Sequence, residues 1–237
     1  MIKLLYKTPL LILLMCFIST VSKAQLGFNY AQYDFGLGAV ANRVIGDAES
    51  IKTTPAAFVN FTYNHSPFVN YVVEIQAGSM EGGKPESESG RYFKNIYKTI
   101  VFRGQLQAGE LIDYSGSQLM NFAKNIYLSS GFGYIVNDIR DVNRTSTDPN
   151  HYGYYTGGED KSSELYIPVR LGYEIKIFNQ YNEPSTKIDL GAQYNYVFGD
   201  NVDGFNAGRS KDKFIQYSIG VKFALGGYTS AGKQIHY

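Results

Sequence analysis

Residues 165–177, LYIPVRLGYEIKI, alternate apolar and polar side chains along their whole length. Every second residue from Leu165 onward is apolar, whereas the residues between them include Arg170, Glu174 and Lys176. A period of two is that of a β-strand with one apolar and one polar face. At about 3.3 Å per residue such a strand reaches roughly 40 Å, and a tilted strand crosses a bilayer with about 9–11 residues. The stretch therefore predicts a strand long enough to span a membrane.

The same alternation recurs along the chain and predicts an all-β protein with eight strands. The seven further strands are expected at residues 33–41, 57–63, 69–77, 96–106, 126–136, 188–198 and 215–225. Long polar loops are expected at residues 42–55, 78–95, 137–163 and 199–212, and short connections at 64–68 and 179–186. The connection 108–125 is longer, and its residues 117–122 are expected to form one or two helical turns. Together these elements predict an antiparallel up-and-down β-barrel.

The N-terminus has the pattern of an export signal. Lys3 and Lys7 precede an apolar run at residues 10–18, and Ser22-Lys23-Ala24 is a small-residue cleavage pattern. The run is shorter than the roughly 20 residues of a transmembrane helix. We therefore expect residues 1–24 to be a signal peptide for the Sec pathway, cleaved after Ala24. Residues 25–225 would then form the barrel, and residues 226–237 a periplasmic tail.

The composition narrows the class of protein further. A formal net charge of +1 gives no bias toward nucleic acid. The chain has 21 Tyr, 25 Gly and no Trp, and its single cysteine, Cys16, lies in the signal. A mature chain rich in tyrosine and glycine, with only one apolar face to each strand, suits a membrane barrel.

Two barrels fit the alternation, because the apolar face of each strand can point inward, as in soluble lipocalins, or outward to lipid. Glycines on the polar face favour the second, since small residues make room inside a narrow barrel; Gly104 alone lies on the apolar face. Loops that alternate between long and short, and aromatic residues at strand ends, favour it too. The polar-face glycines are Gly36, Gly38, Gly131, Gly133, Gly172, Gly191 and Gly220.

The final predicted strand carries a family-level pattern. Ser218, Gly220, Phe223 and Leu225 stand in an order that resembles the C-terminal β-signal of outer-membrane proteins, here followed by twelve more residues. The overall layout resembles small OmpA-like barrels of the outer-membrane porin family, and Gln25 directly after Ala24 is similar to the leader junctions common in outer-membrane proteins of the Bacteroidota. This resemblance implies location in the cell outer membrane. It also implies outer-membrane lipids, lipopolysaccharide and the barrel-assembly machinery as partners.

The polar faces carry the candidate site, a cluster of charged residues inside the barrel. Arg170, Glu174 and Lys176 are expected to face Asp189 on the neighbouring strand. Charges away from bulk water must pair or stay hydrated, which favours a plug of ion pairs with a structural or surface-interaction role for the protein. The alternative is a narrow gated channel in which the pairs exchange partners. The predicted cluster comprises Glu74, Arg103, Arg170, Glu174, Lys176, Asp189 and Lys222.

An outer-membrane lipid-modifying enzyme is the second alternative. Its best candidate residue is His151, in an external loop without a well-placed serine nucleophile, so we expect no catalytic residue. Asp200, Asp203 and Asp212 do not have the spacing of an EF-hand, and we expect these acids to stay in solvent. The sequence therefore predicts no metal site and no cofactor.

Overall fold

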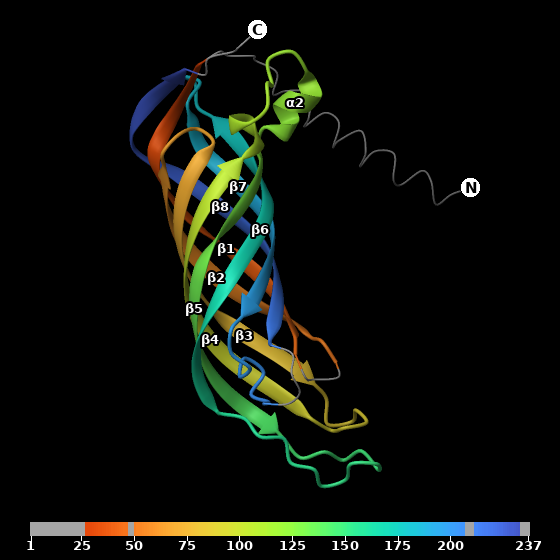
Figure 1. Ribbon diagram of the computed structural model, residues 1–237. Coiled ribbons are helices and arrows are strands. Elements are labelled where there is room, and N and C mark those ends of the chain that lie inside the picture. Colours follow the sequence, from red (N-terminus) through yellow and green to blue (C-terminus); the bar gives the residue numbers. More distant parts are fainter. Residues whose placement is uncertain (1–26, 47–49, 207–210, 233–237) are drawn as a thin grey trace, which may run out of the picture.

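A computed structural model describes residues 27–46, 50–206 and 211–232. Its strands form a closed antiparallel barrel in the order β1-β2-β3-β4-β5-β6-β7-β8, with β8 pairing back to β1 (Figure 1). The predicted fold class is thereby confirmed. Their bounds are β1 Gly27–Ile45, β2 Thr53–Asn64, β3 Val69–Gly83, β4 Tyr92–Gln107, β5 Ile126–Asn143, β6 Lys161–Phe178, β7 Pro184–Val197 and β8 Lys213–Gly232. A 3₁₀ turn, η2 (Ala108–Glu110), and a short helix, α2 (Gln118–Ala123), interrupt the connection from β4 to β5.

The two ends of the barrel differ in their connections. One end, which we call the turn end, holds the β2–β3 and β6–β7 turns, the β4–β5 connection with α2, the start of β1 and the end of β8 (Figure 1). The opposite end, the loop end, holds the connections β1–β2, β3–β4, β5–β6 and β7–β8. The eight predicted strands are all present, and α2 lies where helical turns were predicted.

Most strands extend beyond their predicted bounds, chiefly toward the loop end. β3 and β4 pair as far as Gly83 and Tyr92, and β5 continues to Asn143, so the predicted loops 78–95 and 137–163 are shorter than expected. β8 passes through residue 226 to Gly232, so the segment predicted as a tail is partly strand, and residues 233–237 lie outside the described residues. The predicted signal peptide, residues 1–24, also lies outside them.

The apolar faces point outward, as predicted. Large apolar side chains on the wall are exposed: Phe132 on β5, for example, exposes 70% of its surface. Glu74, on the inward face of β3, is fully buried. Such a wall would be costly in water and is stable against lipid. The closed barrel, with its apolar exterior and its charged side chains buried inside, is the architecture of an outer-membrane β-barrel protein.

Interior glycines make room for large side chains on the neighbouring strand. Gly133 pairs with Tyr166, and Gly172 pairs with Tyr127. A Cβ atom built at either glycine would collide with the ring of its tyrosine. Gly104, on the outer wall, has open space at the same position, in agreement with its predicted face. The glycine pattern therefore marks the interior.

The interior, or lumen, has two layers. The half toward the turn end is polar and charged, as predicted. The half toward the loop end is apolar, so the prediction of a lumen filled by polar and ionic side chains is wrong there. Inward positions such as Phe58 and Val101 belong to this apolar layer. Its buried members are Val40, Val44, Ala56, Phe58, Met80, Phe93, Tyr97, Val101, Ile135, Ile139, Tyr166, Val197, Val202, Phe205 and Phe214.

Candidate functional site

Most of the charged residues predicted to cluster meet in the turn half of the lumen. The centre is Asp189 on β7, which the guanidinium of Arg170 contacts at 3.1 Å and the amine of Lys222 at 2.7 Å. Lys222 also contacts Glu174, at 2.6 Å, so a single ammonium bridges two carboxylates that pair across β6 and β7. Each of these side chains is buried. The arrangement satisfies the rule that buried charges must be paired.

Glu174 also accepts hydrogen bonds from two amides of β4. Gln105 donates to one carboxylate oxygen at 3.2 Å, and Gln107 donates to the other at 2.6 Å. Both oxygens of this buried acid are therefore occupied by donors from β4 and β8. Such a fully hydrogen-bonded carboxylate ties strands on different sides of the lumen together.

A second ion pair lies nearer the middle of the barrel. Arg103 on β4 contacts Glu74 on β3 at 2.7 Å and donates to the side-chain oxygen of Gln193 at 2.6 Å. Glu74 also accepts a 2.6 Å hydrogen bond from Gln76. This pair thus links β3, β4 and β7 across the lumen.

Lys176 lies at the turn end of the lumen and differs from its expected role. Its amine donates to the backbone oxygen of Pro67 at 3.1 Å and to the side chain of Gln107 at 3.0 Å, and lies 4.9 Å from the centre of the Phe68 ring. The expected approach to Asp189 is not observed: Arg170 and Lys222 contact that carboxylate instead. Lys176 therefore closes the turn end of the lumen rather than joining the central cluster.

Two charged residues and one tyrosine of this site were not predicted from the sequence. Lys187 pairs with Asp34 at 2.5 Å, and both are buried. The hydroxyl of Tyr127 donates to Asp189 at 2.6 Å and accepts from Arg170 at 2.7 Å. The alternation carries the signal for all three: Asp34 lies on a polar face, Lys187 is in phase with Asp189, and Tyr127 is in phase with the interior Gly131 and Gly133.

A network of amides separates the charged layer from the apolar layer. Gln216 donates to Asn42 at 2.9 Å and to Gln76 at 2.8 Å, and the hydroxyl of Tyr97 donates to Asn42 at 3.2 Å. These groups and the ion pairs on their turn-end side fill the lumen. None of the following side chains exposes more than 5% of its surface: Glu74, Arg103, Arg170, Glu174, Asp189, Gln193, Gln216 and Lys222. Water in an open pore would reach them, so the described part of the barrel holds no open pore.

The β7–β8 loop closes the loop end of the lumen. Val202 and Phe205 are buried there, and Phe205 packs edge-on against Phe93 with ring centres 6.0 Å apart. The guanidinium of Arg91 lies 5.8 Å from the centre of the Phe205 ring. We call Val202, Phe205 and their apolar contacts the cap.

Two acids of this loop are buried, and the expectation that they stay in solvent is wrong. One carboxylate oxygen of Asp212 accepts from the backbone nitrogen of Val202 at 2.8 Å, and Asp203 accepts from that of Phe205 at 2.9 Å. Burial and the neighbouring Asp203 carboxylate raise the pKa of Asp212 to about 8. Asp200 is only partly buried. The acids thus hold the backbone of the cap.

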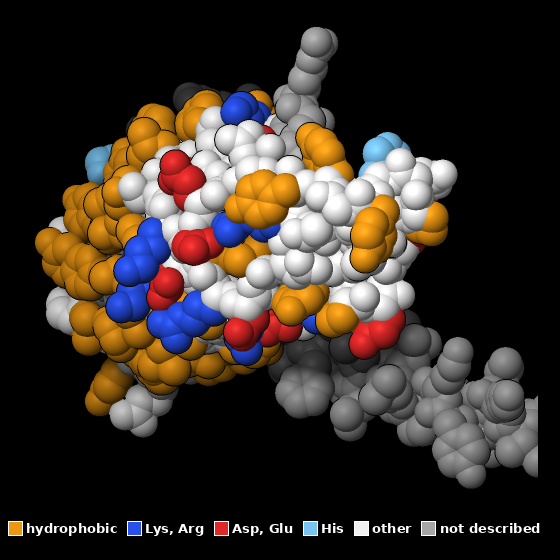
Figure 2. Space-filling view, turned by 90° about the horizontal axis from the view of Figure 1, so that it is seen from below, with side chains coloured by type: hydrophobic (Ala, Val, Ile, Leu, Met, Phe, Trp, Pro, Cys, Tyr) orange, Lys and Arg blue, Asp and Glu red, His pale blue; other side chains and the backbone are white. Residues whose placement is uncertain are grey.

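The β5–β6 loop is a hairpin that projects beyond the barrel (Figure 1). Tyr152, Tyr154 and Tyr155 are exposed on it, Tyr152 to 81%. His151 is also exposed, and its ring nitrogen Nδ1 lies 3.0 Å from Asp148, which lowers the pKa of that carboxyl. Figure 2 shows this end of the molecule, where acidic and basic side chains are intermixed among polar ones. The loop end therefore offers aromatic side chains without a strong charge of one sign.

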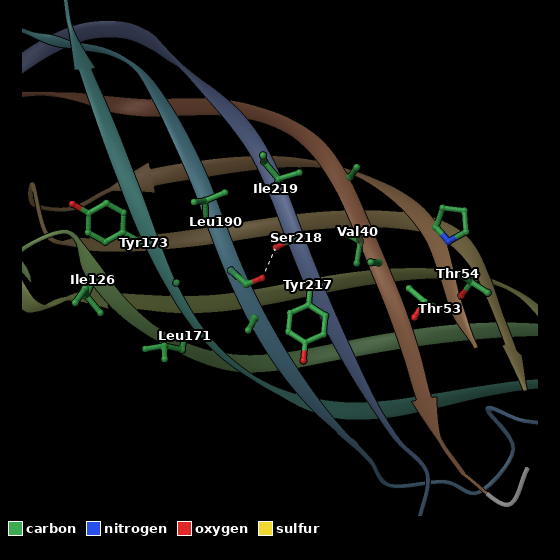
Figure 3. Close-up of a pocket in the computed structure, with 16 residues that line it drawn as sticks. Val40, Thr53, Thr54, Ile126, Leu171, Tyr173, Leu190, Tyr217, Ser218 and Ile219 are labelled. Carbon is green, nitrogen blue, oxygen red and sulfur yellow. Dashed lines mark hydrogen bonds between the residues drawn. The ribbon is translucent and has the colours of Figure 1, made fainter. Parts of the chain in front are cut away.

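A shallow apolar groove of about 920 Å³ lies on the outer wall (Figure 3). It crosses β6, β7, β8 and β1 from Ile126 and Tyr173 at one end to Thr53 and Thr54 at the other. Small outward residues, among them Ala39 and Ala192, line it. Because it lies on the lipid-facing wall, it is open to the membrane rather than to the lumen.

The residues of the predicted assembly signal divide between the two faces of β8. Ser218 donates to the backbone oxygen of Gly191 at 3.3 Å, and Gly220 lies under the ring of Phe58. Phe223 and Leu225 are exposed on the outer wall.

In the described residues no helix is long and apolar enough to cross a membrane, and no group of three or more acidic, His or Cys side chains could hold a metal ion.

No protein-family model matches the chain, and no curated protein matches it. Among solved structures, the Neisserial surface protein A is similar, with a TM-score of 0.45 and 12% identity over 82% of this chain and 98% of that one. Ail, the attachment invasion locus protein of Yersinia pestis, has a TM-score of 0.43 and 13% identity over 82% and 98%. The outer membrane protein AlkL has a TM-score of 0.45 and 11% identity over 91% and 97%.

Proposed function

We propose that this protein is an integral outer-membrane barrel with a closed lumen, which acts as a structural element and as a surface for interaction through its loop end. The observation that carries the proposal is the filling of the lumen by two successive layers, the charged layer toward the turn end and the apolar layer, with its cap, toward the loop end. An eight-stranded barrel is just wide enough for its own side chains. The loop end would face outward, because outer-membrane barrels have short periplasmic turns and longer external loops.

The exposed tyrosines of the β5–β6 hairpin support an interaction role. Tyrosine provides a large, rigid contact area with a polar tip and is enriched at binding surfaces. Tyr152, Tyr154 and Tyr155 lie close together on a hairpin that Arg144 fixes to the molecule, through a 2.8 Å ion pair with Asp160 and a 2.8 Å hydrogen bond to the backbone oxygen of Gly204. The hairpin thus presents its aromatic groups from a held base.

The first experiments test whether the protein lies in the outer membrane and whether its lumen is closed. The protein should remain with the outer-membrane fraction and should migrate faster on a gel unheated than boiled, because the closed barrel resists detergent. In planar bilayers it should give no conductance steps. Recovery from the soluble periplasm, or steady conductance of the unaltered protein, would overturn the proposal.

The surface role is tested with the three tyrosines replaced by serine. Cells that produce the barrel should adhere to glycan-coated or protein-coated surfaces more than cells without it, and the triple variant should lose that gain. Tyr181→Ser, an exposed tyrosine at the turn end, is the matched control and should keep it. Equal adhesion by the triple variant and the unaltered protein would exclude the hairpin as the contact surface.

A narrow gated channel is the second candidate, and one observation favours it. Several buried polar atoms in the charged layer have no protein partner, among them Arg103 Nε, Asn60 Oδ1 and Ser129 Oγ. Such atoms in a polar interior suit ordered water. Conduction would further require the cap to withdraw.

We infer no catalytic role. His151 is exposed on a projecting loop and pairs with Asp148, an arrangement that leaves its ring in water. His151→Ala should therefore leave lipid A unchanged in cells that produce the protein, as judged by mass spectrometry.

For partners, we propose outer-membrane lipids and lipopolysaccharide at the wall, and the barrel-assembly machinery at the β8 pattern of Ser218 to Leu225.

A further inference from the structure

The β4–β5 connection has two parts that face different surroundings. Its first part covers the turn end of the lumen: Gly109 packs under the ring of Phe68, and Tyr114 lies 5.7 Å from that ring. Its second part, α2, contributes no buried side chain. Instead Leu119 exposes 71% of its surface, and Met120 and Phe122 are exposed beside it. This part of the connection therefore presents apolar side chains that the barrel does not cover.

The apolar side of α2 is continuous with the outer wall. The ring of Phe122 stacks on Tyr173 of β6 with centres 4.7 Å apart, and the Tyr173 hydroxyl donates to the backbone oxygen of Phe122 at 3.2 Å. Tyr173 pairs with Ile126, and both residues line the end of the wall groove (Figure 3). α2 thus lies beside the wall at the turn end rather than over the lumen (Figure 1).

The composition of this segment fits a lipid surface. Leu119, Phe122 and Ala123 share one side of the helix at a spacing of three and four, with Asn121 on the other. Residues 115–125 contain no acidic side chain and one basic one, Lys124, so lipid phosphates meet no repulsion there. An amphipathic helix of this kind buries its apolar face at the boundary between headgroups and acyl chains.

We propose that α2 is an interfacial anchor that inserts Leu119, Met120 and Phe122 into the leaflet at the turn end, the periplasmic leaflet. The inference rests on the proposed membrane barrel and adds a contact outside its strands. Its occupant is membrane lipid, because the helix continues the lipid-facing wall.

The absence of tryptophan from the chain makes the test direct. Leu119→Trp is placed in vesicles of phosphatidylcholine and phosphatidylglycerol, with bromine near the headgroup end or the methyl end of the acyl chains. Bromine near the headgroup end should quench the residue most strongly, and its emission should be blue-shifted. Asn121→Trp, on the other side of the helix, is the matched control and should be quenched less. Phe122→Trp replaces the test variant should Leu119→Trp fail to fold.

Two reference variants separate the possible failures. Phe132→Trp, in the middle of the wall, should be quenched most by bromine near the methyl end, and Tyr152→Trp, on the loop-end hairpin, should be unquenched. If Leu119→Trp behaves like Tyr152→Trp while Phe132→Trp is quenched, α2 faces water or a protein partner, and the anchor is refuted. If Phe132→Trp is also unquenched, the membrane barrel itself is refuted.

Discussion

Single residues decide whether the charged layer holds. Lys222 contacts both Glu174 and Asp189, so its amine compensates two buried carboxylates that pair across neighbouring strands. Removing one member of a buried ion pair costs about 3–5 kcal/mol, because the partner stays buried without compensation. Arg170 still faces Asp189 in such a variant, so the greater loss falls on Glu174.

We therefore expect Lys222→Met to lower the free energy of unfolding by about 3–5 kcal/mol. Urea titration of the barrel in lipid vesicles, read by gel mobility, measures it. Lys84→Met is the matched control: Lys84 is exposed in the β3–β4 connection at the loop end, away from the lipid-facing wall, and the change there should stay within about 0.5 kcal/mol. Equal stability of the two variants would show that the ion pairs contribute little.

Asp212 gives the cap a dependence on pH. Because its pKa is raised from 3.8 to about 8 in the folded protein, the folded state binds a proton that the unfolded state has lost between these values. The free energy of unfolding should therefore fall as pH rises through this range, by up to about 1.4 kcal/mol per pH unit. Above the folded pKa the loss is complete.

Asp212→Asn should flatten this dependence, since the amide oxygen still accepts from Val202 and carries no charge. Unfolding by urea at about pH 5 and about pH 8 compares the variant with the unaltered protein. Glu159→Gln, on the exposed β5–β6 hairpin, is the control and should keep the original slope. An unchanged slope in Asp212→Asn would show that another group titrates.

At the scale of the strand, the fit between glycine and tyrosine can be tested. Gly133→Ala would place a methyl group against the ring of Tyr166, whose hydroxyl lies 2.9 Å from Thr99. Forcing an extra methyl group into a packed interior costs about 1–3 kcal/mol. Gly104→Ala, on the outer wall with open space, should be neutral or slightly stabilising. Urea unfolding compares the two, and equal destabilisation would mean that the loss of glycine in a strand matters more than the ring.

Strand positions were predictable because each strand must keep one face toward lipid. The alternation fades where the strands leave the membrane, as at residues 139–143 of β5, because outward side chains such as the exposed Arg140 there need not be apolar, whereas the inward Ile139 belongs to the apolar layer. The hydrogen-bonded ladder nevertheless continues, and so the sequence gives strands that are too short. Lys187 was missed for the same reason, since it lies one residue before the predicted start of β7.

The apolar layer was harder to predict than the wall. Phe58 and Val101 stand on faces that are otherwise polar, and a period of two does not show which apolar residues form a layer across several strands. The β7–β8 loop does contain a local signal, because Val202 and Phe205 are apolar within an otherwise polar and glycine-containing segment. Their burial depends on long-range contacts with residues such as Phe93, which no local pattern contains.

At the scale of the whole molecule, the two layers close the lumen in series. Replacing Val202 and Phe205 by alanine should remove the cap and leave the ion pairs of the charged layer in place. We expect the double variant to remain without conductance in planar bilayers, because the charged layer still fills the barrel. A gated channel predicts the opposite result, namely conductance steps once the cap is removed. Val169→Ala, on the outer wall, is a control for disturbance of the barrel.

The pairing of β1 with β8 has a consequence for how the chain is made. Residues of β1 from Gly27 to Ile45 find half of their ladder partners in Lys213–Gly232. β1 therefore cannot complete its hydrogen-bonded ladder until β8 has been synthesised. Most of the chain must reach the membrane before the barrel can close. Contacts between such distant segments slow folding, and unpaired edges invite aggregation meanwhile. The exported chain should therefore depend on a chaperone during transit, and its strands should acquire protease resistance together rather than from the N-terminus onward.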